Sequence, residues 1–102
     1  MPNIADNIEN AIQQGAPTTL HRVTSKSQIR KNRRASLRGQ QFAGQGKSLD
    51  EYPFASTRQG GAGACVSAVC AKQNSSSGGK LGQFFNKNKI KDGDAFDVKV
   101  VE

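Results

Sequence analysis

Two adjacent carboxylates, Asp50 and Glu51, stand directly before Tyr52 and Pro53 in a chain that is otherwise basic. Cleavage of a phosphodiester bond requires a group that accepts a proton and a ligand for a divalent cation, and a carboxylate can serve as either. Two carboxylates in a row before a proline would equally suit a solvent-exposed turn. The spacing therefore makes Asp50 and Glu51 candidate catalytic residues, with an exposed turn as the alternative interpretation.

Positive charge gathers in the segment 27–38, where an expected helix carries several cations on roughly one side: Lys31, Arg33, Arg34 and Arg38. An arginine suits a phosphate because its planar guanidinium donates two parallel hydrogen bonds. A solvated basic face would give the same pattern. The formal net charge of +7 nevertheless favours a polyanionic partner, either nucleic acid or an anionic membrane surface. No stretch of ~18 apolar residues is present to span a membrane.

The other reactive side chains are one histidine and two cysteines. His21 could act as a general base, but no acidic residue stands within six positions on either side of it. Cys65 and Cys70 occur in an expected strand, and their odd spacing places them on opposite faces, so no disulfide is expected between them. Free thiols are consistent with a reducing compartment. The glycine-rich segment 60–63 lacks the Gly-Lys-Ser/Thr ending of a phosphate-binding loop.

Apolar periodicity and turn residues indicate one domain over residues 1–102, with helices and a small antiparallel sheet, which is an α+β fold. The expected helices span 3–14, about 27–38 with Ser25 or Ser27 as the N-cap, and 80–85. The expected strands span 18–23, 64–72 and 95–101, and the acidic strip runs from 49 to 55. Loops are expected at 40–48 and 74–79, where glycine and small polar residues gather.

The order of these motifs resembles the NucA/NucB family of bacterial deoxyribonucleases. The clearest match is the acidic strip 50–55, which is followed at the family's interval by residues 60–64. Weaker similarities lie in the opening helix, the basic helix and the closing segment, at 7–15, 31–39, 73–74 and 81–83. The resemblance covers nearly the whole chain. It implies a ββα-metal type of nuclease core, in which a strand hairpin and a helix hold one divalent cation.

The resemblance also implies roles for individual residues. Asp50 matches the residue that replaces the usual histidine base, and Glu51 is a second candidate for catalysis and for binding the metal. Gln83 stands where the family has an asparagine ligand on its helix, and its amide oxygen can serve the same purpose. The cation would be Mg²⁺ or Mn²⁺ because the ligands are hard oxygens. No small-molecule cofactor is expected.

DNA is the implied substrate, and we expect cutting to be largely independent of sequence because contacts to phosphates carry no sequence information. The residues expected to contact DNA are Arg33, Arg34, Arg38 and Lys80. Two rival interpretations are a ribonuclease on the same scaffold and a basic module that binds nucleic acid without cutting it.

Two departures from the family pattern bear on these expectations. Secreted members carry a cysteine pair that matches Leu20 and Thr57 here, and the loss of both cysteines fits a domain that acts where disulfides do not form. Those members also have acidic residues that match Arg58 and Gln59. The replacement of these acids removes negative charge near the site, which bears on metal affinity and on contacts with DNA.

The start of the chain, residues 1–4, has neither the basic nor the apolar segment of a signal peptide. A nuclease without restraint would harm its own cell. We therefore hypothesise a toxin domain from the C-terminus of a larger secreted effector, which acts in the cytoplasm of a target cell. The expected partners are DNA and a cognate immunity protein, and no membrane partner is expected.

Overall fold

The computed structural model of the chain describes residues 4–40 and 44–100. Its helices are α1 (Ile4–Gln13), α2 (Lys26–Leu37) and α3 (Ala71–Lys87). Its strands are β1 (Thr19–His21), β2 (Lys47–Tyr52), β3 (Cys65–Cys70) and β4 (Ala95–Asp97). The predicted α+β class with small antiparallel sheets is confirmed. Three parts of the predicted elements lie outside the described residues: residue 3 of the first helix, residues 41–43 of the first loop and residue 101 of the last strand. Residues 1–3, where no signal peptide is expected, also lie outside them.

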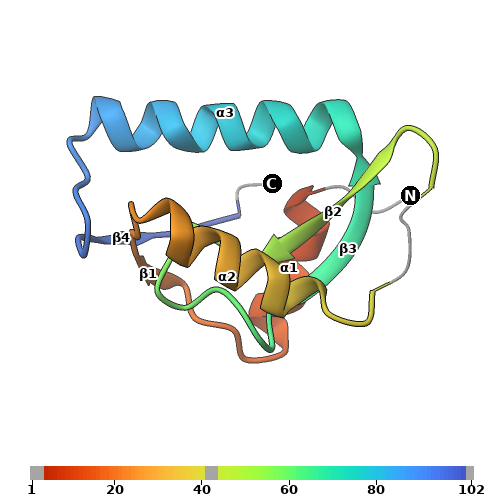
Figure 1. The fold of residues 1–102 in the computed structure, drawn as a ribbon. Helices are drawn as coiled ribbons and strands as arrows, with labels where there is room; N and C mark the ends of the chain where they lie inside the picture. The colour runs from red at the N-terminus through yellow and green to blue at the C-terminus, as the bar shows by residue number, and fades with distance from the viewer. Residues whose placement is uncertain (1–3, 41–43, 101–102) are drawn as a thin grey trace.

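The hairpin of β2 and β3 leads directly into α3, so the chain contains a ββα unit (Figure 1). The two strands pair antiparallel, with Lys47 opposite Cys70 and Tyr52 opposite Cys65. Ala71, the residue after β3, already belongs to α3. Side chains on the hairpin and on the first turns of α3 are therefore held in a fixed relation to one another.

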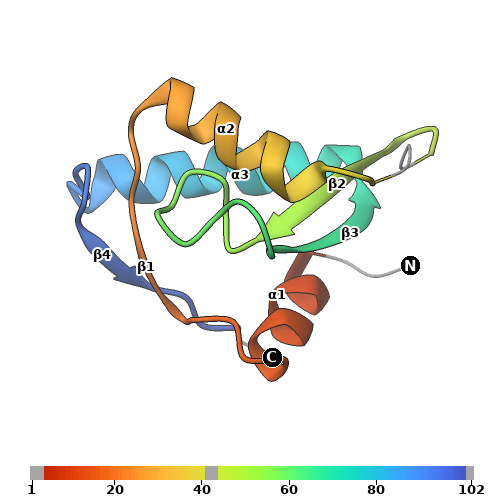
Figure 2. The same ribbon diagram turned by 60° about the horizontal axis from the view of Figure 1, so that its bottom comes forward.

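The second sheet, formed by β1 and β4, lies on the side of the molecule away from the hairpin (Figure 2). It is antiparallel, with Leu20 opposite Phe96. Both strands are shorter than the sequence predicts. The pairing continues beyond them as single hydrogen bonds, such as the one from the Arg22 N–H to the Asp94 carbonyl. The extended segments are therefore longer than the regular strands within them.

The hydrophobic core packs α1, α3 and both sheets around Tyr52 and Leu20, which are fully buried. Phe85 of α3 meets Phe96 of β4 edge to face, with ring centroids 5.1 Å apart. The Tyr52 hydroxyl donates to the Pro17 carbonyl at 2.7 Å, so this polar group is satisfied inside the core. Because Tyr52 ends β2 and Phe85 lies on α3, packing in the core fixes the position of α3 relative to β2.

The boundary between β3 and α3 differs from the prediction. The segment 74–79, expected to be a loop, is helical and belongs to α3, so the expected helix 80–85 is only the later part of that helix. The expected strand 64–72 ends at Cys70, because the next two residues already belong to α3. At the other end of the hairpin, β2 begins at Lys47, within a segment also expected to be a loop.

Tertiary packing explains why a segment rich in serine and glycine is helical. An interior glycine costs ~1 kcal/mol relative to alanine in a helix, so the local preference of this segment is for a loop. A Cβ added at Gly78 or Gly79 would meet nothing within 4 Å, so packing within the chain does not require glycine there. The helix forms because it carries Phe85 into the core, and burial of an apolar face outweighs local propensity.

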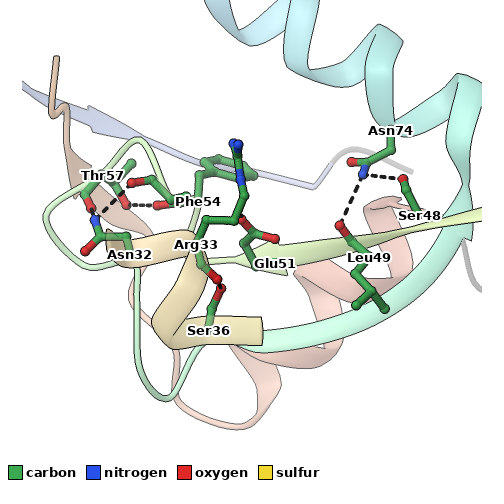
Figure 3. A network of polar contacts seen from close by, with 10 residues as sticks. Asn32, Arg33, Ser36, Ser48, Leu49, Glu51, Phe54, Thr57 and Asn74 are labelled. Atoms are coloured by element: carbon green, nitrogen blue, oxygen red, sulfur yellow. Dashed lines mark hydrogen bonds and ion pairs between the residues drawn. The ribbon is translucent and has the colours of Figure 1, made fainter. Parts of the chain in front are cut away.

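The helix α2 begins at Ser25, one of the two residues predicted as its N-cap. The Ser25 side chain accepts a hydrogen bond from the Gln28 backbone N–H at 3.3 Å. On the inner face of α2, Asn32 is buried and its Nδ2 donates to the Thr57 carbonyl at 3.1 Å. This bond ties α2 to the segment after β2, so Arg33, the next residue of the helix, lies beside the strand (Figure 3).

Candidate active-site groove

A groove of about 930 Å³ runs along β2 between α2 and α3. Residues 48–51 of β2 line it, together with residues from both helices and from the segment after β1. The α3 residues that line it include Asn74, Gly78, Leu81 and Phe85, whose spacing of three and four residues marks one helix face. The ββα unit therefore supplies the floor and one wall of the groove, and α2 supplies the other wall.

Glu51 places its carboxylate in the groove beside Arg33 (Figure 3). Arg33 Nε lies 3.6 Å from Glu51 Oε1, and the Glu51 side chain is 10% exposed whereas that of Arg33 is 59% exposed. Burial raises the pKa of the Glu51 carboxyl, and the Arg33 charge opposes this shift while the Asp50 charge adds to it. Because Arg33 is largely exposed, the ion pair is weak and Glu51 can accept another cation.

Asp50 also borders the groove, but its carboxylate is held from α1. Asn7 Nδ2 donates to Asp50 Oδ2 at 3.0 Å and to the Asp50 carbonyl at 3.3 Å. Burial raises the pKa of the Asp50 carboxyl, and the hydrogen bond from Asn7 opposes this shift. Asp50 and Glu51 meet different partners, Asn7 and Arg33, so the adjacent pair becomes two separately held carboxylates that border one groove. Asn7, a buried polar residue on the apolar side of α1, is not among the site residues predicted from the sequence.

The amide that the structure brings into the groove belongs to Asn74. Its Nδ2 donates to Ser48 Oγ at 2.7 Å and to the Leu49 carbonyl at 3.2 Å, which leaves the amide oxygen as an acceptor. Gln83, the predicted ligand, is exposed and does not line the groove. It follows Asn74 by roughly two and a half turns at ~3.6 residues per turn, which puts it on the opposite face of α3.

The cations that line the groove, among the described residues, are Arg22, Lys26, Arg33 and Lys80. Two of the four predicted DNA contacts are therefore in the groove, whereas Arg34 and Arg38 are exposed on α2 outside it. Arg22 is not among the residues that the sequence predicts to contact DNA. A signal was present, because Arg22 stands two residues after the buried Leu20 and so continues the inward face of β1.

A family model described as deoxyribonuclease NucA/NucB matches residues 8–99. The chain belongs to the NucA/NucB family. The match spans β1 to β4 and includes every groove residue named above. The family is one of deoxyribonucleases, so DNA is its substrate class. No curated protein matches the chain.

The groove of this NucA/NucB domain offers few donors for a metal ion. Within residues 4–40 and 44–100, no three His, Cys, Asp or Glu side chains come together in a group that could hold a metal. Glu51 and Asn74 both border the groove, and their side chains carry a carboxylate and an amide oxygen. Mg²⁺ commonly keeps several waters and binds through one or two carboxylates together with substrate phosphates. In their chemistry, these two oxygen donors suit a hard divalent cation.

The single histidine of the NucA/NucB domain does not line the groove. His21 Nδ1 lies 2.8 Å from Gln59 Nε2, and the His21 backbone N–H donates to Gln59 Oε1 at 2.9 Å. An amide nitrogen only donates, so Nδ1 accepts and the ring proton belongs on Nε2. Gln59 thus orients His21 on the side of β1, and the structure does not bring His21 together with Asp50 and Glu51.

Removal of the Asp50 charge should stabilise this domain at neutral pH. Because burial raises the pKa of Asp50, the folded state keeps this proton to higher pH than the unfolded state. The Asp50 carboxyl therefore contributes most to the free energy of unfolding at acidic pH. This contribution is lost as the pH rises through the pKa of Asp50 in the folded state. We expect Asp50→Asn to melt at a higher temperature than wild type at pH 7 in EDTA, with a difference that shrinks as the pH falls.

The control for this experiment is Glu9→Gln, which removes a charge from α1 outside the groove. It measures the general effect of removing one carboxylate from this basic domain. If Asp50→Asn melts below wild type at pH 7, the hydrogen bond from Asn7 outweighs the effect of burial on the Asp50 carboxylate.

Proposed function

We propose that this domain is a metal-dependent DNA endonuclease that hydrolyses phosphodiester bonds in the groove between α2 and α3. The proposal depends on the residues that line the groove. The Glu51 carboxylate, the Asn74 amide oxygen and the cations Arg33 and Lys80 line one cavity in a chain of a deoxyribonuclease family. A cationic groove attracts the phosphate backbone, and hard oxygen donors within it suit a divalent cation.

Glu51 and Asn74 are the proposed ligands, and Mg²⁺ or Mn²⁺ is the proposed ion. When bound, the cation would offset negative charge that develops on the phosphate oxygens. Asp50 is the proposed base. Asn7 donates to Oδ2 of its carboxylate, and Asp50 borders the groove. Oδ1 is the oxygen proposed to accept the proton of the attacking water. Burial favours this role, because a raised pKa makes Asp50 a stronger proton acceptor. The role of Gln83 as a ligand stays a prediction from the resemblance.

Phosphate contacts are proposed from both walls of the groove, by Arg33 from α2 and by Lys80 from α3. Arg34 and Arg38 lie outside the groove and are proposed to contact the backbone beyond it. Contacts of this kind position the DNA without reading base edges, so we expect little preference for base sequence.

Incubation of a supercoiled plasmid with the domain and Mg²⁺ or Mn²⁺ tests the proposal directly. We expect nicking followed by linearisation, and we expect EDTA to stop the reaction. Undiminished cleavage in EDTA would contradict the dependence on metal. Preferential cutting of RNA of matching sequence would indicate a ribonuclease, and a gel shift without cleavage would indicate a basic module that only binds.

We further propose that the domain is the toxic part of a larger secreted effector, acts in the cytoplasm of a target cell and is neutralised at home by an immunity protein. Free thiols at Cys65 and Cys70 support this. Leu20 and Thr57, at the positions of the cysteine pair of secreted members, are fully buried, so the fold does not depend on an oxidising compartment.

Expression of the domain inside bacterial cells tests the toxin proposal. Host DNA should fragment, and the Asp50→Asn variant should leave it intact. Intact DNA in cells that contain the folded wild-type domain would contradict the proposal.

Among the described residues, no helix is both long enough and apolar enough to cross a membrane.

A further inference from the structure

Arg22 is a cation that the structure fixes in the groove but that the proposed reaction leaves without a role. It follows β1 and lines the groove together with Phe85 of α3. Its guanidinium carbon lies 4.5 Å from the centroid of the Phe85 ring, and its Nη1 donates to the Ile90 carbonyl. The stacking and the hydrogen bond hold the side chain in place before any ligand arrives.

The charge of Arg22 has no partner within the described part of the chain, where no carboxylate lies within ion-pair distance of it. The turn that bonds to the Arg22 backbone does contain two carboxylates, Asp92 and Asp94. Both accept backbone N–H groups of other residues instead. A fixed positive charge without an internal partner raises the affinity of the groove for an anion.

Arg22 lies at the Phe85 end of the groove, away from Asn74, one of the proposed cation ligands. Asn74 and Phe85 both line the groove from α3, and the rise of a helix puts them ~16 Å apart along its axis. We infer that Arg22 binds a backbone phosphate other than the scissile one, farther along the DNA. The inference rests on the proposed function, and it adds a second phosphate subsite at the Phe85 end of the groove.

The chemistry of a guanidinium suits this task. It carries five N–H donors in one plane, and one nitrogen is engaged with Ile90, so other donors remain for the oxygens of a phosphate. A side chain that is already ordered loses less conformational freedom on binding than a free one. Arg22 is therefore better prepared to bind a phosphate than the exposed cations of α2, such as Arg30.

Fluorescence anisotropy with a labelled DNA duplex in EDTA tests the inference without cleavage. We expect Arg22→Met to weaken binding by roughly ten- to hundredfold and to reduce the log–log salt slope by ~0.9. Arg22→Lys keeps the charge, so it should keep the slope and weaken binding less. The control is Arg30→Met, which removes one exposed charge from α2 outside the groove. If Arg22→Met behaves like Arg30→Met, the inference is wrong.

Substrates with one uncharged methylphosphonate linkage test the same inference with an unaltered protein. Wild type with Mg²⁺ should cut about tenfold more slowly when a linkage at one fixed offset from the cut is neutral, which corresponds to one lost charged contact. Arg22→Met should be insensitive to that linkage. If only the cleaved linkage matters, the inference is wrong, even where Arg22→Met fails to fold.

The two proposals fail in different ways. Failure of the nuclease proposal would appear as wild type that binds DNA with the Arg22-dependent salt slope but cuts no substrate, and this outcome would still support the phosphate subsite. Failure of the subsite would appear as full cleavage with no dependence on Arg22 in either experiment.

Discussion

Cleavage of DNA by Asp50→Asn should be slower than wild type by roughly 10²–10⁴-fold at saturating cation, which is the usual contribution of a general base. Asparagine preserves the shape of the side chain and can still accept the hydrogen bond from Asn7, but it cannot take a proton from water. DNA affinity in EDTA should stay near the wild-type value, because the phosphate contacts come from the cations. Retention of more than a tenth of the wild-type rate would exclude Asp50 as the base.

A parallel Glu51→Gln variant separates the two carboxylates. The loss of a cation ligand should be partly recovered at higher Mg²⁺ or Mn²⁺, whereas the loss of a base should not respond to the cation concentration. Glu9→Gln, on α1 outside the groove, should cut at the wild-type rate. If higher cation concentration restores cleavage by Asp50→Asn but not by Glu51→Gln, then Asp50 is the cation ligand and Glu51 is the base.

The cation concentration for half-maximal cleavage should rise by at least roughly tenfold in Asn74→Ala, since even the loss of a residue that only supports a metal ligand commonly has an effect of that size. Gln83→Ala should leave the titration unchanged, because Gln83 is exposed and does not line the groove. The resemblance predicts the reverse, so this pair of variants decides between a ligand assigned by alignment and one assigned by geometry.

Asn74→Asp serves as the matched variant, because it keeps an oxygen that can bind a cation but loses the donor that bonds to Ser48 and Leu49. We expect it to retain most of the cation affinity that Asn74→Ala loses. If the two Asn74 variants are equally impaired, Asn74 acts through its hydrogen bonds. If only Gln83→Ala shifts the titration, Gln83 is the ligand.

Local patterns in the sequence predict much of the fold. Apolar spacing, capping residues and stop residues predict α1 and α2 within one or two residues, and Ser25 is one of the two residues expected as the N-cap of α2. The odd spacing of Cys65 and Cys70 predicts two free thiols, as observed. These features depend on residues close together in the chain, where periodicity and capping chemistry act directly.

The beginning of α3 could not be predicted in this way. The segment 74–79 has the composition of a loop, and its helical structure depends on the packing of Phe85 against β4, which follows it in the chain. The same packing decides which face of α3 lines the groove. It therefore also decides that Asn74 lies beside β2 while Gln83 is exposed.

The sequence by itself determines the net charge, the acidic strip with Asp50 and Glu51, and the membership of a deoxyribonuclease family. Only the tertiary structure decides that these two carboxylates meet different partners, Asn7 for Asp50 and Arg33 for Glu51, and that Arg22 lines the groove. The reason is physical. The chemistry of a side chain belongs to its residue type, whereas its burial, its pKa and its neighbours are set by contacts between segments that are far apart in the chain.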